Sequence, residues 1–328
     1  AKTLFPYTTL FRSGFVLAGM SGNLWLFCLA QGLLLGLLGT SATFVPLVAD
    51  TSLWFVKRRG IAVAVCASGN YVAGAIWPPV VQHFVETVGW RPTCIGLGIF
   101  SVVTMLALAG AMRAKTPAAV AAPVKAGGPV PSDRPFGLSL GQAQALLCVA
   151  GTACCVAMSM PQVHIVAYCT DLGFGAAQGA QMLSLMMAAG IVSRLLSGWV
   201  SDHIGGLRTL MLGSVLQGVA LLLFLPFDGL VPLYVVSGLF GLFQGGIVPS
   251  YALIVREYFT PKEAGARVGT VLMSTLLGMA LGGWLSGAIF DRTGSYRAAF
   301  VNGIAWNLVN VGIVGFLLVR VRKSRLQA

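Results

Sequence analysis

The sequence predicts an all-α polytopic membrane protein, because its composition is apolar, its hydrophobic residues fall in long runs and its basic residues follow a membrane pattern. Hydrophobic residues make up 57 % of the 328-residue chain, and charged residues only 9 %. A soluble domain carries roughly 25 % charged residues. A chain with so few charges cannot cover a water-facing surface, so lipid must be its main solvent.

Nine apolar runs are long enough to be transmembrane helices, since a span needs ~20 mostly apolar residues. Their approximate ranges are 24–49, 61–84, 92–111, 140–168, 177–199, 209–226, 231–254, 268–290 and 298–319. Glycines recur inside them at four-residue spacing, as at Gly32 and Gly36 or Gly278 and Gly282. Small residues at this spacing let helices approach closely in lipid, so we expect tight helix–helix contacts.

Segment 112–139 interrupts this pattern. It combines Pro117, Pro123, Pro129, Pro131 and Pro135 with alanine, glycine and several charged residues. This composition predicts a flexible polar linker between two helical bundles.

The basic residues predict how the chain is oriented in the membrane. One alternating set of loops holds most of them: Lys57, Arg58, Arg59, Arg113, Lys115, Lys125, Arg134, Arg208, Arg256, Lys262, Arg267, Arg320, Arg322, Lys323 and Arg325. The opposite set holds Arg91, Arg292 and Arg297. Cytoplasmic loops carry an excess of Lys and Arg, so the linker and the C-terminus are predicted to be cytoplasmic. The net charge of +12 does not indicate nucleic-acid binding, which needs one continuous basic face rather than short separate clusters.

The seven cysteines and three histidines form no catalytic or metal-binding pattern. Almost all cysteines lie inside apolar runs without a CxxC pair, which indicates small core residues rather than disulfides or a metal site. His83, His164 and His203 are scattered, and no HExxH or G-x-S-x-G motif is present. The sequence therefore predicts no enzyme, no metal and no cofactor. A channel is also disfavoured, since no filter-like loop or ring of charges is visible.

A weak internal repeat relates residues 36–91 to residues 241–297. GLLGTSATFVP faces GLFQGGIVP, and Trp54-Phe55 before KRRG faces Tyr258-Phe259 before TPKEAG. Parallel six-helix repeats are a known transporter plan. The repeat predicts a twelve-helix parent protein whose first two helices, and most of the third, are missing from this chain.

The repeat and the linker together predict the domain organisation. Residues 1–13, AKTLFPYTTLFRS, resemble translated sequencing-adapter read-through and are interpreted as non-native; a genuine but unusual N-terminus is the alternative. Residues 14–111 are predicted to be the remnant of an N-terminal bundle (the end of helix 3 and helices 4–6), 112–139 the cytoplasmic linker, 140–320 a complete six-helix C-terminal bundle (helices 7–12) and 321–328 a cytoplasmic tail.

The segment GWVSDHIGGLR, residues 198–208, resembles the G-x-x-x-D-[RK]-x-G-[RK]-[RK] loop of the major facilitator superfamily. The resemblance implies a conformational latch built from Gly198, Asp202, Gly205 and Arg208. Asp202 is expected to accept hydrogen bonds from helix N-termini and to pair with Arg208, while the glycines permit a tight turn. His203 and Gly206 stand where the pattern has basic residues, which weakens the predicted latch. A plain helix–turn–helix loop is the alternative.

Two further segments resemble bacterial monocarboxylate-transporter-like proteins. They are FVKRRGIAVAVCASGNYVAG, residues 55–74, and MPQVHIVAYCTDLGF, residues 160–174. DRTGSYR, residues 291–297, recurs before the last helix of many facilitators. The resemblance covers about residues 20–320 and implies a partial major facilitator fold of the monocarboxylate and oxalate–formate branch, N-terminally truncated.

Arg194 is the strongest candidate for substrate binding. An arginine at membrane depth is costly unless it faces a partner or a water-filled cavity, and its planar fork suits a carboxylate. In the family that the chain resembles, an arginine on the eighth helix engages the substrate, often with an aspartate one turn earlier. Gly190 stands at that earlier position, which puts proton coupling through this helix in doubt. A structural arginine is the alternative.

His164 and Tyr168 on the preceding helix are the other predicted substrate-binding residues. Histidine titrates near physiological pH and could bind an anion or carry a coupling proton, although a lone helical histidine is often structural. Tyr168, Asn70, Gln162 and Gln244 are polar groups in membrane runs. They could line a cavity or hydrogen-bond between helices.

The predicted function is secondary active transport of a small organic anion by alternating access, driven by a proton or anion gradient. Helix 268–290 carries no charge, which argues against a dicarboxylate held by two cations and favours a monocarboxylate. Transport of another small solute, drug-like or sugar-like, and an inactive fragment are the alternatives. The expected location is a bacterial inner membrane, with lipid, the anion and, where a proton gradient drives transport, a proton as partners, no nucleic acid and no required oligomer.

Overall fold

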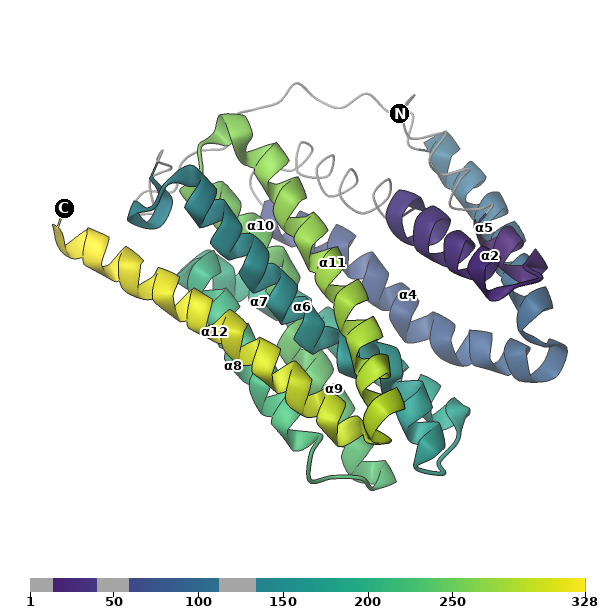
Figure 1. Ribbon diagram of the computed structural model, residues 1–328. Coiled ribbons are helices and arrows are strands. Elements are labelled where there is room, and N and C mark those ends of the chain that lie inside the picture. Colours follow the sequence, from purple (N-terminus) through teal and green to yellow (C-terminus); the bar gives the residue numbers. More distant parts are fainter. Residues whose placement is uncertain (1–13, 40–58, 112–133, 328) are drawn as a thin grey trace. The chain divides into compact units, whose positions relative to one another are not determined.

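A computed structural model describes residues 14–39, 59–111 and 134–327, and these residues form helices joined by short turns (Figure 1). The chain divides into two compact units. One contains residues 1–67 and 79–122, and the other contains residues 68–78 and 123–328. The predicted adapter-like segment 1–13 and linker residues 112–133 lie outside the described residues.

The first unit is a small helical group. It contains the helical segment 14–20, α2 (Leu24–Cys28), η1 (Leu29–Gly39), α5 (Trp90–Ala111) and the two ends of α4 (Arg59–Val88). Asn23 caps α2, because its side-chain oxygen accepts a hydrogen bond from the Leu26 amide at 2.7 Å. The segment 14–20 packs on α5 through Gly19, where an added Cβ would come within 2.9 Å of the Arg91 carbonyl oxygen.

The second unit is a bundle of long apolar helices. They are α6 (Leu140–Asp171), α7 (Ala176–Ile204), α8 (Gly206–Leu223), α9 (Leu230–Gln244), α10 (Ile247–Tyr258), α11 (Pro261–Thr293) and α12 (Tyr296–Gln327). Because α9 and α10 form one apolar stretch, 230–258, the bundle offers six candidate membrane spans. These correspond to the six spans expected between 140 and 319, so the predicted all-α polytopic fold is confirmed.

The N-terminal spans are matched less completely. Residues 90–108 of α5 form a seventh candidate span among the described residues, whereas the apolar helix 24–36 is shorter. The predicted run 24–49 continues into residues outside the described part. The helix α4 is 30 residues long, and it is not among the candidate spans found within the described residues.

Local sequence signals set the helix ends of the bundle. Ser139 and Gln142 form a reciprocal capping box at the start of α6, with bonds of 3.2 and 3.3 Å. Pro261 stands in the first turn of α11, where its missing N–H is harmless, and Gly294 ends the helix in the left-handed conformation at φ 64°.

The structured bundle begins before the predicted boundary at residue 140. A short turn, η2 (Pro135–Gly137), precedes α6, and the Phe136 ring is buried 4.5 Å from the Tyr258 ring. Arg320 Nε on α12 donates a hydrogen bond to the Phe136 carbonyl oxygen at 3.0 Å. The end of the predicted linker is therefore packed on the bundle.

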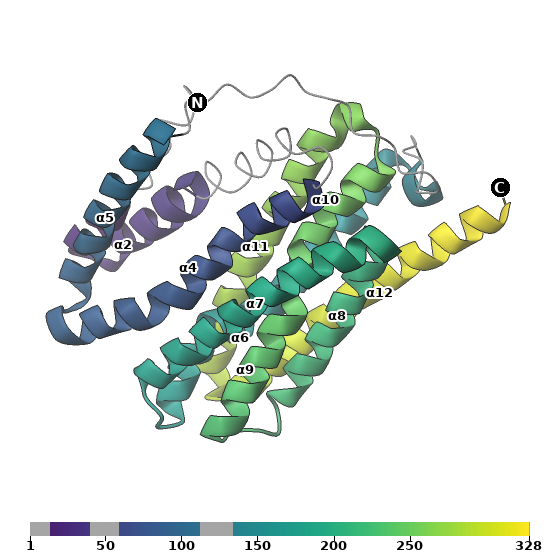
Figure 2. The same cartoon turned by 180° about the vertical axis from the view of Figure 1, so that it is seen from behind.

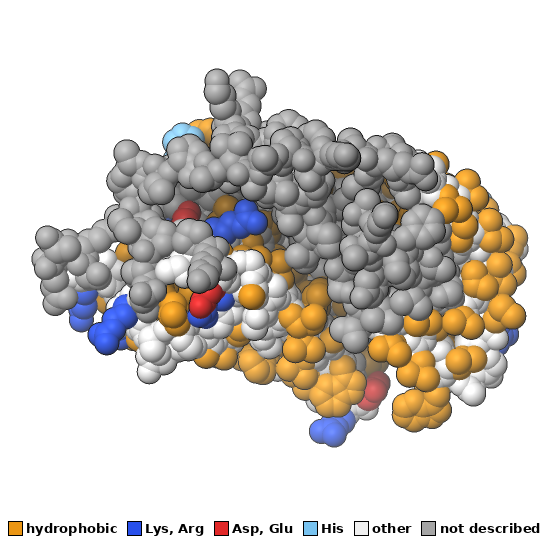
Figure 3. Space-filling view, turned by 90° about the horizontal axis from the view of Figure 1, so that it is seen from above, with side chains coloured by type: hydrophobic (Ala, Val, Ile, Leu, Met, Phe, Trp, Pro, Cys, Tyr) orange, Lys and Arg blue, Asp and Glu red, His pale blue; other side chains and the backbone are white. Residues whose placement is uncertain are grey.

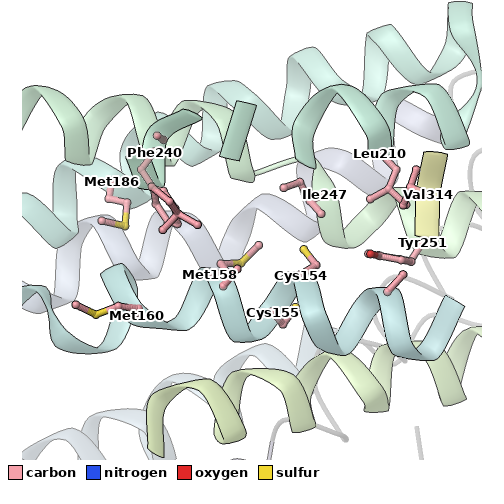
Figure 4. Packing of buried hydrophobic residues seen from close by; sticks show 14 of the residues in the cluster. Cys154, Cys155, Met158, Met160, Met186, Leu210, Phe240, Ile247, Tyr251 and Val314 are labelled. Carbon is pink, nitrogen blue, oxygen red and sulfur yellow. The ribbon is translucent and has the colours of Figure 1, made fainter. Parts of the chain in front are cut away.

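The helix α6 is the centre of the bundle and packs against both α11 and α12 (Figures 1 and 2). On α11, a Cβ added to Gly278 would lie 2.9 Å from Thr152 Cα, and one added to Gly282 would lie 2.6 Å from Val156 Cα. The expected close approach at this four-residue glycine spacing is therefore confirmed. Large apolar residues such as Met186 and Phe240 fill the remaining core (Figure 4).

A buried polar network joins four helices of this bundle. Its members are Cys154 (α6), Ser214 and Gln217 (α8), Tyr251 (α10), and Asn307 and Asn310 (α12). Tyr251 donates to Asn310 Oδ1 at 2.9 Å, and Asn310 donates to Ser214 Oγ at 2.7 Å. Hydrogen bonds between helices satisfy polar groups that lipid cannot solvate, so this network fixes how the helices pack.

The surface is unusually apolar. Trp284 is 69 % exposed and Val231 70 % exposed, although both are large hydrophobic residues. Apolar side chains cover much of the described surface in Figure 3, and charged side chains are few. Such a surface suits lipid rather than water.

Candidate functional site

Arg194 is a buried cation inside the bundle. It lies in the second half of α7, roughly 15 Å from the end of the helix at 1.5 Å per residue. The residue is only 6 % exposed. Its Nε donates a hydrogen bond to the Gly245 carbonyl oxygen at 3.1 Å, and its Cζ lies 4.3 Å from the centre of the Tyr71 ring.

Glycine makes the Arg194 hydrogen bond possible. Gly245 lies at the junction of α9 and α10, and a Cβ added to it would collide with the Gly190 carbonyl oxygen on α7. A Cβ added to Gly241, one turn earlier, would collide with the Met186 carbonyl oxygen. The backbones of α7 and α9 therefore touch, which brings the Gly245 carbonyl within reach of the guanidinium.

Gln244 precedes Gly245 and is fully buried. Among the residues that the structure describes, neither its amide nitrogen nor its amide oxygen has a hydrogen-bond partner. The hydroxyl of Ser237, two turns earlier on the same face of α9, is also buried without a hydrogen-bond partner among the described residues. A buried amide without a partner is costly, so its presence beside the acceptor of Arg194 calls for an explanation.

The structure does not bring His164 and Tyr168 to Arg194. His164 precedes the end of α6 by seven residues, and Arg194 follows the start of α7 by eighteen, so their depths differ by roughly 16 Å. His164 Nε2 lies 2.9 Å from the Gly283 carbonyl oxygen on α11. Their assignment to the substrate stays a prediction.

Tyr168 belongs to a polar cluster at the opposite end of the bundle from Arg320. Its hydroxyl donates to Asp228 Oδ1 at 2.9 Å, and Arg297 Nη2 lies 2.7 Å from Asp228 Oδ2. The Tyr168 hydrogen bond, followed by Arg297, holds the pKa of the Asp228 carboxyl below its ordinary value. This cluster ties α6, the α8–α9 loop and α12 together.

The predicted latch lies at the turn between α7 and α8. Gly205 ends α7 at φ 85°, so the expected positive-φ turn is present at this residue. Gly206 begins α8, and its amide donates to both carboxylate oxygens of Glu257 at 3.2 Å. Glu257 on α10 therefore caps the N-terminus of α8, a role that the sequence analysis predicted for Asp202. Asp202 and Arg208 are exposed, Gly198 accepts a hydrogen bond from Ser201, and their latch role stays a prediction.

No group of three metal-ligating side chains gathers within residues 14–39, 59–111 and 134–327. A surface pocket of about 330 Å³ lies in the first unit, lined by Ser21, Asn23, Phe27, Trp90 and Arg91 among others. It contains none of the predicted substrate-binding residues. His83 is exposed on α4, also in the first unit.

Known transporters match nearly the whole chain. The family model described as Major Facilitator Superfamily matches residues 1–236 and 146–328. Monocarboxylate transporter 13 of Rattus norvegicus is 30 % identical over 311 residues, which cover 92 % of this chain and 69 % of that protein. MFS-type transporter opdF of Penicillium oxalicum is 26 % identical over 322 residues, covering 95 % and 72 %.

Solved structures support the same fold. The crystal structure of a variant of the E. coli fucose:proton symporter FucP superposes with a TM-score of 0.61 at 14 % identity, covering 95 % of this chain and 84 % of that one. The monocarboxylate transporter 13 sequences come from rat and cattle, so bacterial origin stays a prediction. The chain belongs to the Major Facilitator Superfamily and is an integral membrane transporter.

Proposed function

We propose that this transporter carries a small organic monocarboxylate by alternating access, with Arg194 as the anion-binding residue. The observation that carries the proposal is the burial of a permanent cation in a membrane helix, where it is 6 % exposed. Burying a charge is costly unless a counter-charge arrives, and a substrate carboxylate supplies one. The likeness to monocarboxylate transporter 13 of rat supports the same substrate class.

Gln244 extends the proposed site. Gln244 is the last residue of α9, directly before Gly245, and its side-chain amide offers an N–H donor group and an oxygen acceptor to a substrate. Arg194 offers donors alone, so it recognises the carboxylate, while Gln244 can recognise a neighbouring polar group. A proton or anion gradient as the driving force is part of the proposal.

The test is uptake of labelled butyrate and L-lactate by proteoliposomes that contain the purified chain. Arg194→Ala should abolish uptake, because one charge-assisted hydrogen bond contributes roughly 1.5–3 kcal/mol, about 10–100-fold in affinity. Arg194→Lys keeps the charge but loses the planar fork, so it should weaken uptake.

The matched control is Arg292→Ala, which removes an exposed arginine at the end of α11. This variant should transport like the native chain. Normal carboxylate uptake by Arg194→Ala would show that Arg194 is structural and that the site assignment is wrong. Uptake of neutral solutes alone would indicate another facilitator substrate.

A further inference from the structure

A tyrosine ring covers the buried guanidinium of Arg194. Tyr71 lies in the 68–78 segment of α4, which belongs to the same compact unit as α7. Its ring centre is 4.3 Å from Arg194 Cζ, and the two residues are 8 % and 6 % exposed. A cation over a ring face is attracted by the quadrupole of the ring, and more strongly where water is excluded.

Gly190 is the residue that admits this ring. It lies one turn before Arg194 on α7, and a Cβ added to it would fall on the ring carbons Cδ1 and Cε1 of Tyr71. Any side chain at position 190 would therefore displace the ring. The Tyr71 ring of α4 can therefore occupy this place only because position 190 of α7 is glycine.

The ring and the Gly245 carbonyl constrain the guanidinium in complementary ways. The carbonyl oxygen accepts a hydrogen bond from Nε, which lies in the guanidinium plane. The Tyr71 ring presents its face to the same group, with Arg194 Cζ lying over the ring. One partner holds Nε by a hydrogen bond and the other covers the cation, so the side chain is held in place before an anion arrives.

We infer that Tyr71 is the positioning residue of the anion site. Its ring, admitted by Gly190, orients Arg194 and places electron density beside the cation. Unlike a carboxylate, the ring does not gain or lose a proton in the physiological pH range. This inference rests on the proposed function of Arg194. A phenol stays protonated across the physiological range, whereas a carboxylate in the same place would titrate. The choice of ring over carboxylate therefore sets how anion binding responds to pH.

The groups that face Tyr71 support this reading. They are the Arg194 guanidinium of α7 and the Cys154 and Cys155 thiols of α6, and α9 contributes the Gly245 backbone beside Arg194. Arginine is always charged in proteins, and tyrosine ordinarily titrates near ~10. Anion affinity should therefore change little between about pH 5.5 and 7.5, because neither the ring nor the guanidinium changes its charge there.

The first experiment needs no substrate and measures thermal unfolding of the purified chain in detergent. Tyr71→Ala should lower the unfolding temperature, while Tyr71→Phe, which keeps the ring and loses only the hydroxyl that bonds Arg194, should lower it much less. Adding Gly190→Asp to Tyr71→Ala should restore stability at about pH 7.5, since a carboxylate one turn from Arg194 pairs with it. The restoration should disappear below about pH 4, where the carboxylate protonates.

Two controls match these changes. Tyr234→Ala removes a tyrosine that bonds to Gln181 elsewhere in the bundle, and Gly69→Ala adds a methyl group at an open position of α4. Gly190→Ala should destabilise the chain in contrast to Gly69→Ala, because its methyl group displaces the ring. If the Tyr71→Ala, Gly190→Asp double variant is no more stable than Tyr71→Ala at neutral pH, ring and carboxylate are not interchangeable and the inference is overturned.

The second experiment titrates butyrate and L-lactate against intrinsic tryptophan fluorescence at several pH values. Tyr71→Ala should lower affinity on the order of 10-fold, because the aromatic face positions the cation. Tyr71→Phe keeps the ring and loses only the hydroxyl, so it should lower affinity much less. In the double variant affinity should rise on acidification by up to ~10-fold per pH unit, as the competing carboxylate protonates. A native affinity as steep in pH as that of the double variant would contradict the inference. Failure of the native chain to bind either anion would overturn the proposed function, and the unfolding experiment would then decide the role of Tyr71.

Discussion

At the scale of single residues, the polar groups inside the bundle differ in whether the protein itself satisfies them. Asn307 and Asn310 hydrogen-bond to α8, so their role is to hold helices together. Gln244 is buried without such a partner among the described residues. Since unsatisfied buried groups are costly, this contrast separates the proposed substrate site from the structural network.

A prediction at this scale concerns the acid stability of the Asp228 cluster. The folded pKa of Asp228 is lowered, first by the Tyr168 hydrogen bond and then by Arg297. A lowered folded pKa contributes stability above the unfolded value of about 3.9, and this contribution is lost as pH falls through the folded value. Asp228→Asn should therefore unfold at a lower temperature than the native chain near neutral pH, and the difference should shrink as the pH falls below about 4.

Tyr168→Phe should remove the larger part of this effect, because it deletes the principal hydrogen bond to the carboxylate. Asp291→Asn, at an exposed carboxylate near the end of α11, serves as the control. A difference between Asp228→Asn and the native chain that persists unchanged in strong acid would mean that the cluster acts through packing rather than through ionisation.

At the scale of elements, the hydrophobic runs and the glycine spacing predicted much of what the structure shows. The six spans of the bundle and the close α6–α11 contact follow from apolar length and from small residues at Gly278 and Gly282. Arg194 could be singled out because a charge at membrane depth is conspicuous. Its partners could not, since a tyrosine in α4 and a backbone carbonyl between α9 and α10 leave no mark in hydrophobicity.

A prediction at this scale compares two adjacent glycines of α11. A methyl group at Gly282 would lie 2.6 Å from Val156 Cα and the Val156 carbonyl oxygen, so Gly282→Ala must separate α11 from α6. Overpacking of this kind costs about 1–3 kcal/mol. A methyl group at Gly283 meets only Val163 at 3.6 Å, and alanine is a better helix former than glycine.

Gly283→Ala is therefore the matched control and should be neutral or slightly stabilising. Thermal unfolding of both variants, with the native chain alongside, measures the difference. Equal unfolding temperatures for the two variants would show that the helices adjust to a methyl group at position 282 and that the glycine spacing is not a packing requirement.

At the scale of the whole molecule, family membership rests on agreement between the family model, the relatives and the fold. The internal repeat, and the division into two bundles that it implies, stay predictions. The latch motif located the α7–α8 turn, but Glu257 caps the helix there, since sequence spacing cannot show which distant carboxylate reaches a helix end.

The last prediction is the orientation of the bundle in the membrane. Its successive helices place the α7–α8 turn and the C-terminal end of α12 at one end, and the α11–α12 turn at the other. Arg208, Arg320, Arg322 and Lys323 belong to the first end, which the positive-inside rule assigns to the cytoplasm. Arg208→Cys and Thr293→Cys, each made in a cysteine-free chain, put one thiol at an exposed position of each end. An impermeant maleimide added to spheroplasts should label Thr293→Cys at once, and Arg208→Cys only after the membrane is permeabilised. Labelling of Arg208→Cys from outside, with Thr293→Cys protected, would invert the topology, and the linker and C-terminus would then lie on the external side.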